Sequence, residues 1–260
     1  MDLKGKTAII TGSTSGIGLG IAKGFAAQGI NIMLNGFGDS FEIEKERQAI
    51  ENQGVACIYN DADMTQPDEI TAMIEETVKV FGSIDIVVNN AGIQHVAPVE
   101  EFSPEKWDSI IAINMSSSFH TVRAAIPYMK RQGWGRIINI ASAHGLIASP
   151  FKSAYVTAKH GVLGFTKTIA LEVAEDNITC NAICPGYVLT PLVEKQIPDT
   201  AKSRGISEEE VKRDVLLSAQ WTKKFVTVEE LAGTSLFLCS EHAENITGTH
   251  ISVDGGWTAS

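Results

Sequence analysis

The sequence predicts an α/β fold: a doubly wound, seven-stranded parallel sheet with helices on both faces, in three layers. Two observations indicate this class. Short β-branched runs alternate with helical patterns along the 260 residues, and those runs are apolar almost throughout rather than at every second position. Strands buried on both faces have such continuous patterns, and right-handed crossovers between them place helices on both sides of the sheet.

The expected elements follow one another without a linker. We expect strands at residues 7–11, 31–35, 55–59, 84–88, 136–140, 178–183 and 250–253. We expect helices at residues 16–28, 40–52, 67–81, 104–131 and 153–174. No low-complexity stretch interrupts this alternation, so residues 1–260 are expected to form a single domain. The exception is a polar, charged and helical stretch at about 187–224, which fits an active-site lid or a solvated helix pair equally well.

Composition excludes several classes of protein. A net charge of −10 disfavours a nucleic-acid surface, although a local cationic pocket for a small anion stays possible. The cysteines lack a second pair of ligands for a metal and are expected to be buried thiols: Cys57, Cys180, Cys184 and Cys239. We see no signal peptide and no apolar run of about 20 residues, the length that spans a membrane. We therefore expect a cytoplasmic protein without a metal site.

A glycine-rich turn joins the first expected strand to the first expected helix. Gly12, Gly16 and Gly18 allow a tight turn and a close approach of the backbone to a diphosphate. The N-terminus of the following helix supplies unpaired N–H groups and a partial positive charge. Three residues separate the first two glycines, which differs from the GxGxxG spacing. The position between a strand and a helix nevertheless predicts a dinucleotide site.

The end of the second strand normally decides between NAD and NADP. An acidic side chain there binds the ribose 2′-hydroxyl, whereas an arginine accommodates a 2′-phosphate. The chain has neither in Asn35-Gly-Phe-Gly38, and residues 13–15 carry no cation, so NAD is favoured. Asp39 is either the hydroxyl acceptor or the cap of the next helix. Asp63 either meets the adenine or forms a turn.

Tyr155 and Lys159 lie four residues apart on an expected helix, so their side chains share one face. A phenol with a pKa of about 10 is a poor base at neutral pH. A neighbouring ammonium and an oxidised nicotinamide ring would both favour the phenolate and lower that pKa. Ser142, at the end of the fifth strand, would hydrogen-bond the same substrate oxygen. The three residues predict transfer of a proton together with a hydride.

These motifs resemble the short-chain dehydrogenase/reductase family over essentially the whole chain. The matching residues are Thr11-Gly12, Gly16-Ile17-Gly18, Asp63, Asn89-Asn90-Ala91-Gly92, Asn114, Ser142, Tyr155, Lys159 and Pro185-Gly186. The resemblance implies a Rossmann fold with strand order 3-2-1-4-5-6-7 and a homotetramer built on the two long helices. It also implies that Asn114 completes a catalytic tetrad with Ser142, Tyr155 and Lys159, and that it orders a water in the proton relay.

The same resemblance implies where NAD binds. The implied contacts are Gly12, Thr14, Ser15, Gly16, Ile17, Gly18, Phe37, Asp63, Met64, Asn90, Ala91, Gly92, Tyr155, Lys159, Pro185, Gly186, Val188 and Thr190. Among these, Thr190 is expected to meet the nicotinamide carboxamide, with Val188 at the same end of the cofactor.

Four polar residues are expected to border the nicotinamide pocket: Gln94, His144, Lys152 and Gln196. A lysine beside the tyrosine base would be desolvated and unpaired if the substrate were apolar, which is costly. A substrate carboxylate offsets that cost, and the two amides and the imidazole add hydrogen bonds. Jointly the four residues predict a small hydroxy acid, whereas each one alone fits a surface or capping role equally well.

The quartet resembles that of bacterial D-3-hydroxybutyrate dehydrogenases. This resemblance implies a carboxylate clamp of the four residues, with Ser142 and Tyr155 at the reacting oxygen and Trp257 closing the pocket around a short carbon chain. Tyr187 stands where a tryptophan is expected and Leu189 where an arginine is expected, which leaves chain-length selectivity open.

We therefore expect reversible, NAD-dependent oxidation of (R)-3-hydroxybutyrate to acetoacetate. One alternative is a reductase of 3-oxoacyl thioesters or of other short-chain ketones. An alternative of another class is a non-catalytic, nucleotide-binding sensor.

Overall fold

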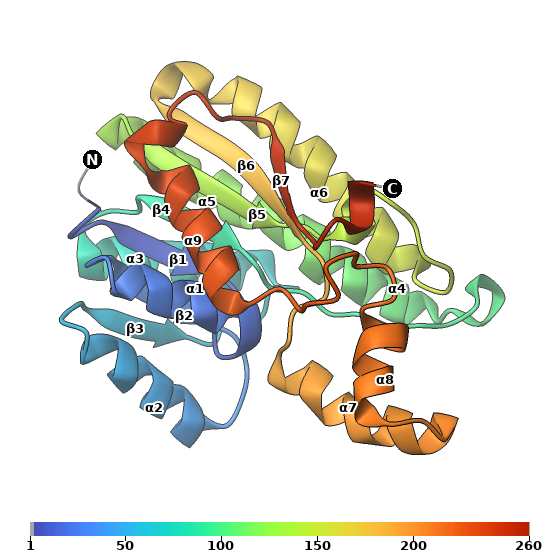
Figure 1. The fold of residues 1–260 in the computed structure, drawn as a ribbon. Coiled ribbons are helices and arrows are strands. Elements are labelled where there is room, and N and C mark those ends of the chain that lie inside the picture. Colours follow the sequence, from blue (N-terminus) through green and yellow to red (C-terminus); the bar gives the residue numbers. More distant parts are fainter. Residues whose placement is uncertain (1–2, 260) are drawn as a thin grey trace.

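A parallel sheet forms the centre of the molecule (Figure 1). The computed structural model describes residues 3–259, without the side chains of residues 191, 192, 195, 196, 199, 200 and 203. Within this range the strands are β1 (Thr7–Ile10), β2 (Asn31–Asn35), β3 (Cys57–Asn60), β4 (Ile86–Asn89), β5 (Gly135–Ile140), β6 (Ile178–Pro185) and β7 (His250–Val253). Their order is β3-β2-β1-β4-β5-β6-β7, so the predicted fold class and strand order are confirmed.

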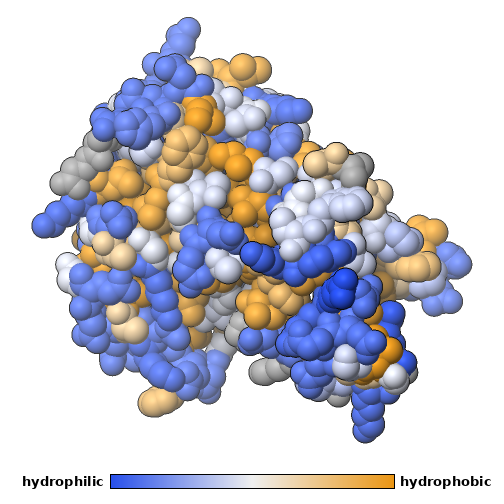
Figure 2. All heavy atoms as spheres, in the orientation of Figure 1, coloured by the Kyte–Doolittle hydropathy of each residue, from blue (hydrophilic) through white to orange (hydrophobic). Residues whose placement is uncertain are grey.

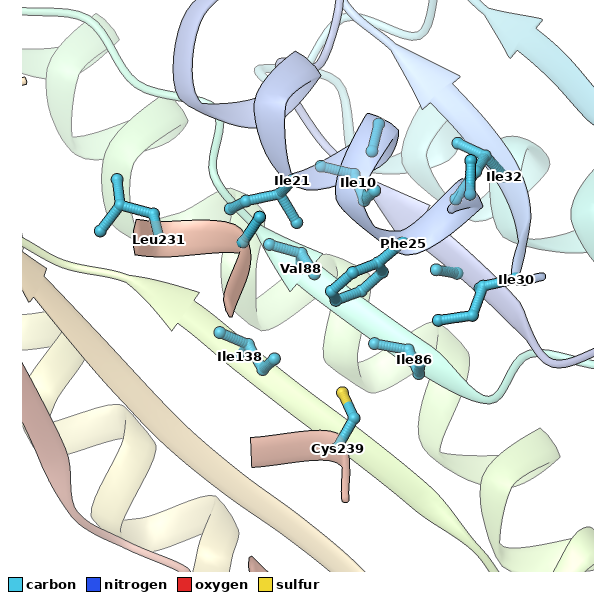
Figure 3. Close-up of a cluster of buried hydrophobic side chains, with 14 of the residues drawn as sticks. Ile10, Ile21, Phe25, Ile30, Ile32, Ile86, Val88, Ile138, Leu231 and Cys239 are labelled. Atoms are coloured by element: carbon cyan, nitrogen blue, oxygen red, sulfur yellow. The ribbon is translucent and has the colours of Figure 1, made fainter. Parts of the chain in front are cut away.

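Helices cover both faces of this sheet. They are α1 (Gly16–Ala26), α2 (Ser40–Glu51), α3 (Pro67–Phe81), α4 (Pro104–Ile111), α5 (Ser117–Gln132), α6 (Ser153–Glu172), α7 (Pro191–Arg204), α8 (Glu208–Glu210) and α9 (Val228–Cys239). Alternate residues of one strand face opposite layers. Ile10 therefore packs with α1 and α9 (Figure 3), whereas Ile9 packs with α3, α5 and α6 on the other face.

Helix α9 has no counterpart among the helices expected from the sequence. Its segment is apolar on most sides and rich in small residues, so it lacks the one-sided pattern of a surface helix. It packs closely against α1, where a Cβ added to Gly24 would lie 2.7 Å from the Cβ of Ala232. Glycine is needed on α1 because the two helix backbones approach so closely.

The predicted single helix at residues 104–131 is interrupted. A π-helical turn, Ala112–Ser116, separates α4 from α5. Within this turn the side chain of Asn114 is buried and makes two hydrogen bonds to the backbone of Ile93. Its Oδ1 accepts the Ile93 N–H, and its Nδ2 donates to the Ile93 carbonyl, both at 2.9 Å. The irregular turn allows this contact between distant segments, and such turns are frequent at functional sites.

Residues 187–224 leave the sheet at the carboxyl ends of its strands and carry α7 and α8 (Figure 1). The outer surface of this lobe is strongly hydrophilic (Figure 2). The fully buried Gln220 connects the two ends of this lobe. The Oε1 of Gln220 accepts the Tyr187 N–H, and its Nε2 donates to the Lys224 carbonyl at 2.7 Å. The two ends of the lobe are thereby held together beside β6.

The cysteines are all buried free thiols, as expected, and burial raises the pKa of Cys239 to about 12. The described residues contain no group of side chains suited to hold a metal ion. None of the helices in residues 3–259 combines the length and apolarity needed to cross a membrane.

Candidate active site

The glycine turn lies between β1 and α1, as predicted, and its backbone requires glycine. Gly12 and Gly16 have φ angles of +62° and +56°, which favour glycine strongly. A Cβ on Gly12 would lie 2.8 Å from the Cα of Ala91. Ser15 precedes α1 without a side-chain cap, and the first turn of α1 has no acidic residue. The N–H groups of this turn are therefore suited to a diphosphate such as that of a nicotinamide dinucleotide.

Side-chain hydrogen bonds join the turn after β1 to the loop after β4. The amide nitrogen of Asn90 donates to the carbonyls of Thr11 and Gly12, both at 2.9 Å. The hydroxyl of Thr11 in turn accepts the N–H groups of Asn90 and Ala91, both at 3.0 Å. The rim at which the strand order reverses is thus rigid, which suits the binding of a dinucleotide. Thr11 is a positioning residue that was absent from the predicted cofactor contacts.

The end of β2 holds the glycine turn in place. Asn35 is fully buried, and its Oδ1 accepts the Gly12 N–H at 3.3 Å while its Nδ2 donates to the Ala62 carbonyl at 2.9 Å. Asp39 caps α2 by accepting the N–H groups of Phe41 and Glu42. Capping, one of the two alternatives left open, is therefore the role that the structure shows for Asp39.

Several other predicted cofactor contacts lie around the same turn. Thr14 donates its hydroxyl to the Phe37 carbonyl at 2.9 Å, which ties the exposed Phe37 to the turn. Asp63 accepts the Thr65 N–H at 2.8 Å in a local turn and is half-buried, so the turn-forming alternative is observed. The side chain of Met64 packs in the core on the face of α3.

The segment after β6 reaches back to the turn. Gly186 donates its N–H to the Val253 carbonyl at 2.9 Å, and Val188 is buried in a bridge with Val226. Thr190 caps α7, and its Cγ2 lies 3.5 Å from the position of a Cβ on Gly16. Residues 185–190 are thus adjacent to the predicted diphosphate site.

Lys159 and Tyr155 share one face of α6, as predicted. The Nζ of Lys159 lies 5.7 Å from the ring centroid of Tyr155 and donates to the Ile140 carbonyl at 2.7 Å. Burial lowers the pKa of Lys159 to about 8. The hydroxyl of Ser142 accepts the His144 N–H at 3.1 Å and bonds the Tyr155 side chain. The three predicted catalytic side chains therefore lie together at the end of β5.

Burial opposes the ionisation of Tyr155. Burial raises its pKa, the hydrogen bond with Ser142 lowers it to a smaller extent, and Lys159 is not among the causes. Desolvation favours the neutral phenol. The expected lowering of this pKa by an ammonium together with an oxidised nicotinamide ring stays a prediction, and it would have to overcome this effect of burial.

The side chain of Asn114 contacts the loop after β4. Both polar atoms of its side chain are engaged by Ile93, so the side chain is a structural amide, as its residue type alone suggested. Each of these atoms can make one further hydrogen bond, and the role of Asn114 in a proton relay stays a prediction.

Three aromatic rings extend from Tyr155 in a chain of ring contacts. The ring of His144 lies edge-on to Tyr155, with centroids 6.1 Å apart, and edge-on to Trp257 at 5.0 Å. Tyr187 stacks on Trp257 with centroids 5.4 Å apart and an angle of 5° between the planes. Burial, followed by the charge of Lys152, lowers the pKa of His144 to about 4. His144 is therefore neutral at pH 7, with one ring nitrogen able to donate and the other able to accept a hydrogen bond.

Lys152 precedes α6 and is half-buried near His144. Burial alone lowers its pKa, with no acidic partner in the described part of the chain. Gln94 is exposed in the loop after β4, and the side chain of Gln196 lies outside the described residues. The structure thus brings together His144, Lys152 and the reaction centre, but neither glutamine.

Trp257 is held by a turn that the sequence reading did not identify. The carboxylate of Asp254 accepts the N–H groups of Gly256 and Thr258 at 3.0 Å and the Thr258 hydroxyl at 2.6 Å. A Cβ on Gly255 would lie 3.2 Å from the Nε2 of Gln220. Asp254 and Gln220 therefore position Trp257 beside His144 and Tyr187, and the adjacent Gly255-Gly256 pair is the local signal for such a turn.

Known proteins resemble the chain over nearly its whole length. A family model described as Enoyl-(Acyl carrier protein) reductase matches residues 12–258. The D-beta-hydroxybutyrate dehydrogenase of Rhizobium meliloti (strain 1021) is 61% identical over 98% of this chain and 99% of its own. The enzyme of the same name from Cupriavidus necator is 56% identical over 99% of each chain.

More distant relatives carry other names. The 3-oxoacyl-(acyl-carrier-protein) reductase of Staphylococcus epidermidis is 35% identical over 96% of this chain and 98% of its own. The glycine turn, the Ser142, Tyr155 and Lys159 cluster and these matches agree, and the chain belongs to the short-chain dehydrogenase/reductase family.

Proposed function

We propose that the chain catalyses the reversible oxidation of (R)-3-hydroxybutyrate to acetoacetate with NAD. The observation that carries this proposal is the half-buried Lys152, which has no acidic partner in the described part of the chain and lies near a neutral His144, whose ring is edge-on to Tyr155. An ammonium that is desolvated without a partner is costly, and a substrate carboxylate would offset the cost. The names of the relatives from Rhizobium meliloti and Cupriavidus necator support the same substrate.

The residues divide the reaction between them. Tyr155 takes the proton of the substrate hydroxyl, and Ser142, bonded to the Tyr155 side chain, holds the same oxygen. When bound, NAD accepts the hydride from the carbinol carbon. Lys159 stabilises the phenolate and anchors the nicotinamide ribose. Burial opposes ionisation of Tyr155, and the positive charge of a bound, oxidised nicotinamide would favour the phenolate.

The charges near the end of β2 favour NAD over NADP. The lysine and arginine of α2 are already paired: Lys45 lies 3.0 Å from Glu42, and Arg47 lies 2.7 Å from Glu44 and from Glu51. The positive charge of each is thus offset by a neighbouring carboxylate, and residues 35–38 add no cation that could neutralise a 2′-phosphate. The hydroxyl groups of an unphosphorylated ribose need no such cation.

A reductase of 3-oxoacyl thioesters is the alternative that the 35% identical relative represents. Such a substrate carries no carboxylate near the reacting carbon, which would leave Lys152 buried without a partner. A non-catalytic sensor would need neither the Ser142–Tyr155 contact nor the buried Lys159.

One assay separates these functions. The purified protein is incubated with NAD and (R)- or (S)-3-hydroxybutyrate, and separately with NADPH and a 3-oxoacyl thioester. We expect NADH only from the (R)-acid. Faster turnover of the thioester with NADPH would favour the reductase, and no turnover with any pair would favour the sensor.

We further propose a cytoplasmic homotetramer in which residues 187–224 act as a lid over the substrate. The side of α5 and α6 carries a hollow of about 300 Å³ lined by Met115, Ser116, Phe119, His120, Gly161 and Phe165. Phe119 is 47% exposed, and the Nδ1 of His120 is buried without a hydrogen-bond partner among the described residues. Both features suit a face that a second copy covers. Sedimentation velocity of the protein and of Phe119→Asp tests this: the variant should dissociate, and an unchanged tetramer or a monomeric parent would contradict the proposal.

A further inference from the structure

Phe151 has a backbone conformation that its residue type disfavours. Its φ angle is +67°, in the left-handed region that bulky L-residues rarely adopt. It lies at a turn with Pro150 immediately before it. Proline followed by a positive φ is typical of a type II turn, whose third position usually holds glycine or asparagine. The backbone of Phe151 is therefore strained at a position where glycine or asparagine would be less strained.

The side chain does not explain this strain, because it is 56% exposed. The backbone of Phe151 does have a defined contact: its carbonyl accepts the N–H of Ala97 at 3.0 Å. That hydrogen bond joins the loop after β4 to the loop before α6.

The two joined loops carry residues of the proposed carboxylate clamp. Lys152 follows Phe151 directly and is the last residue before α6. Its carbonyl accepts the Val156 N–H at 2.9 Å. Gln94 lies between two anchored points of the other loop. Ile93 is held by the side chain of Asn114, and Ala97 is held by Phe151.

We propose that Phe151 is a positioning residue for substrate binding. Its left-handed backbone directs the chain from the turn into Lys152, and its carbonyl holds the loop that carries Gln94. The inference rests on the proposed function, because it concerns the carboxylate site of the same reaction. Backbone strain at a binding site is retained when the surrounding structure requires that conformation.

The test compares two substitutions at this position. Phe151→Ile keeps an apolar side chain but disfavours positive φ further, because isoleucine is β-branched. We expect it to raise the KM for (R)-3-hydroxybutyrate about tenfold while the KM for NAD and kcat change less than about twofold. Phe151→Gly removes the ring but accepts the conformation, so its KM should stay near that of the parent. An equal rise of KM in both variants would show that the ring matters and would overturn the inference.

Gly133→Ile is the matched control. Gly133 has the same φ of +67°, and a Cβ added there meets nothing within 4 Å. It lies between α5 and β5, away from the pocket. The control should lose stability without a change in the KM for hydroxybutyrate. A similar rise in KM would mean that Phe151→Ile acts through general destabilisation, which contradicts the inference.

A double-mutant cycle with Lys152→Met tests the route of the effect. If Phe151 acts through Lys152, Phe151→Ile should have little further effect on kcat/KM in the Lys152→Met background. A full additional loss would overturn the inference.

Amide exchange gives a readout that does not depend on the substrate. The Ala97 N–H should exchange faster in Phe151→Ile than in Phe151→Gly, and equal rates would again contradict the inference. A parent protein that forms no NADH from hydroxybutyrate would refute the proposed function alone, because the exchange rates would still test the role of Phe151.

Discussion

The cofactor side and the substrate side of the site differ in how completely their polar groups are paired before any ligand binds. Around the glycine turn, Thr11, Asn35 and Asn90 bond the backbone of neighbouring loops. On the substrate side, Lys152 has no acidic partner in the described part of the chain, and His144 is held neutral by burial. The first side is rigid without cofactor, whereas the second is electrostatically incomplete without an anion. Selectivity for the acid should therefore reside on the substrate side.

Removing the proton acceptor should have the largest effect. Tyr155→Phe keeps the ring beside Lys159 but lacks the hydroxyl that bonds Ser142. We expect turnover to fall about 10³-fold, in the range of general acid–base catalysis. Binding of NAD, followed by protein fluorescence, should be retained. Turnover near that of the parent would remove Tyr155 from the proton transfer.

A change in the glycine turn should affect only the cofactor side. Gly12→Ala places a Cβ 2.8 Å from the Cα of Ala91, whereas Gly5→Ala has a similar positive φ and open space around it. We expect the Kd for NAD to rise about tenfold or more in Gly12→Ala, because the turn must shift. Calorimetric titration measures both variants. A similar loss in Gly5→Ala would indicate that the collision with Ala91 is not the cause.

Burial of His144 should make stability sensitive to acid. Its pKa falls from 6.5 to about 4 on folding, so the unfolded chain takes up the proton first. The contribution of neutral His144 to the free energy of unfolding is therefore fully present above pH 6.5. It is lost as the pH falls toward 4, by about 3 kcal/mol in total. Urea unfolding at several pH values measures this.

His144→Gln should unfold with a weaker pH dependence in that window. His250→Gln provides the control, because His250 is exposed on β7 and is not among the causes of the His144 shift; its pH dependence should match that of the parent. A loss of equal size in His144→Gln would show that other groups cause the acid sensitivity.

Of the effects predicted here, the smallest is that of a substitution at Tyr187 on the selectivity for chain length. It stacks on Trp257, which lies beside His144. Tyr187→Ala would enlarge the pocket wall and remove a ring contact, so kcat/KM for hydroxybutyrate should fall several-fold. The ratio of kcat/KM for 3-hydroxyhexanoate to that for hydroxybutyrate should rise. An unchanged ratio would place Tyr187 outside the chain-length limit.

Most of the fold could be predicted from the sequence because its strands are apolar throughout and its helices have distinct starting signals. Pro67 begins α3 where it was expected, and β2 and β7 have the predicted limits. Helix α9 was missed because it is apolar around most of its surface. The π-helical turn was missed because it depends on the contact of Asn114 with Ile93, which local patterns do not reveal.

The reacting groups of the site were predictable, but their electrostatics were not. The four-residue spacing of Tyr155 and Lys159 fixes their common helix face. The rise in the pKa of Tyr155 results from burial by the whole fold. The stacking of Tyr187 on Trp257 joins segments that are far apart in the chain, and no spacing rule predicts it.

The central claim is that Lys152 selects a substrate carboxylate, and the methyl ester of (R)-3-hydroxybutyrate tests it most directly. The ratio of kcat/KM for the acid to that for the ester is measured in the parent, in Lys152→Met and in Lys167→Met, which changes an exposed lysine of α6, the helix that Lys152 precedes. We predict that the parent and Lys167→Met prefer the acid by about 10- to 100-fold, the strength of a charged hydrogen bond, and that Lys152→Met loses this preference. A parent that accepts acid and ester equally, or a Lys152→Met variant that still prefers the acid, would contradict the claim.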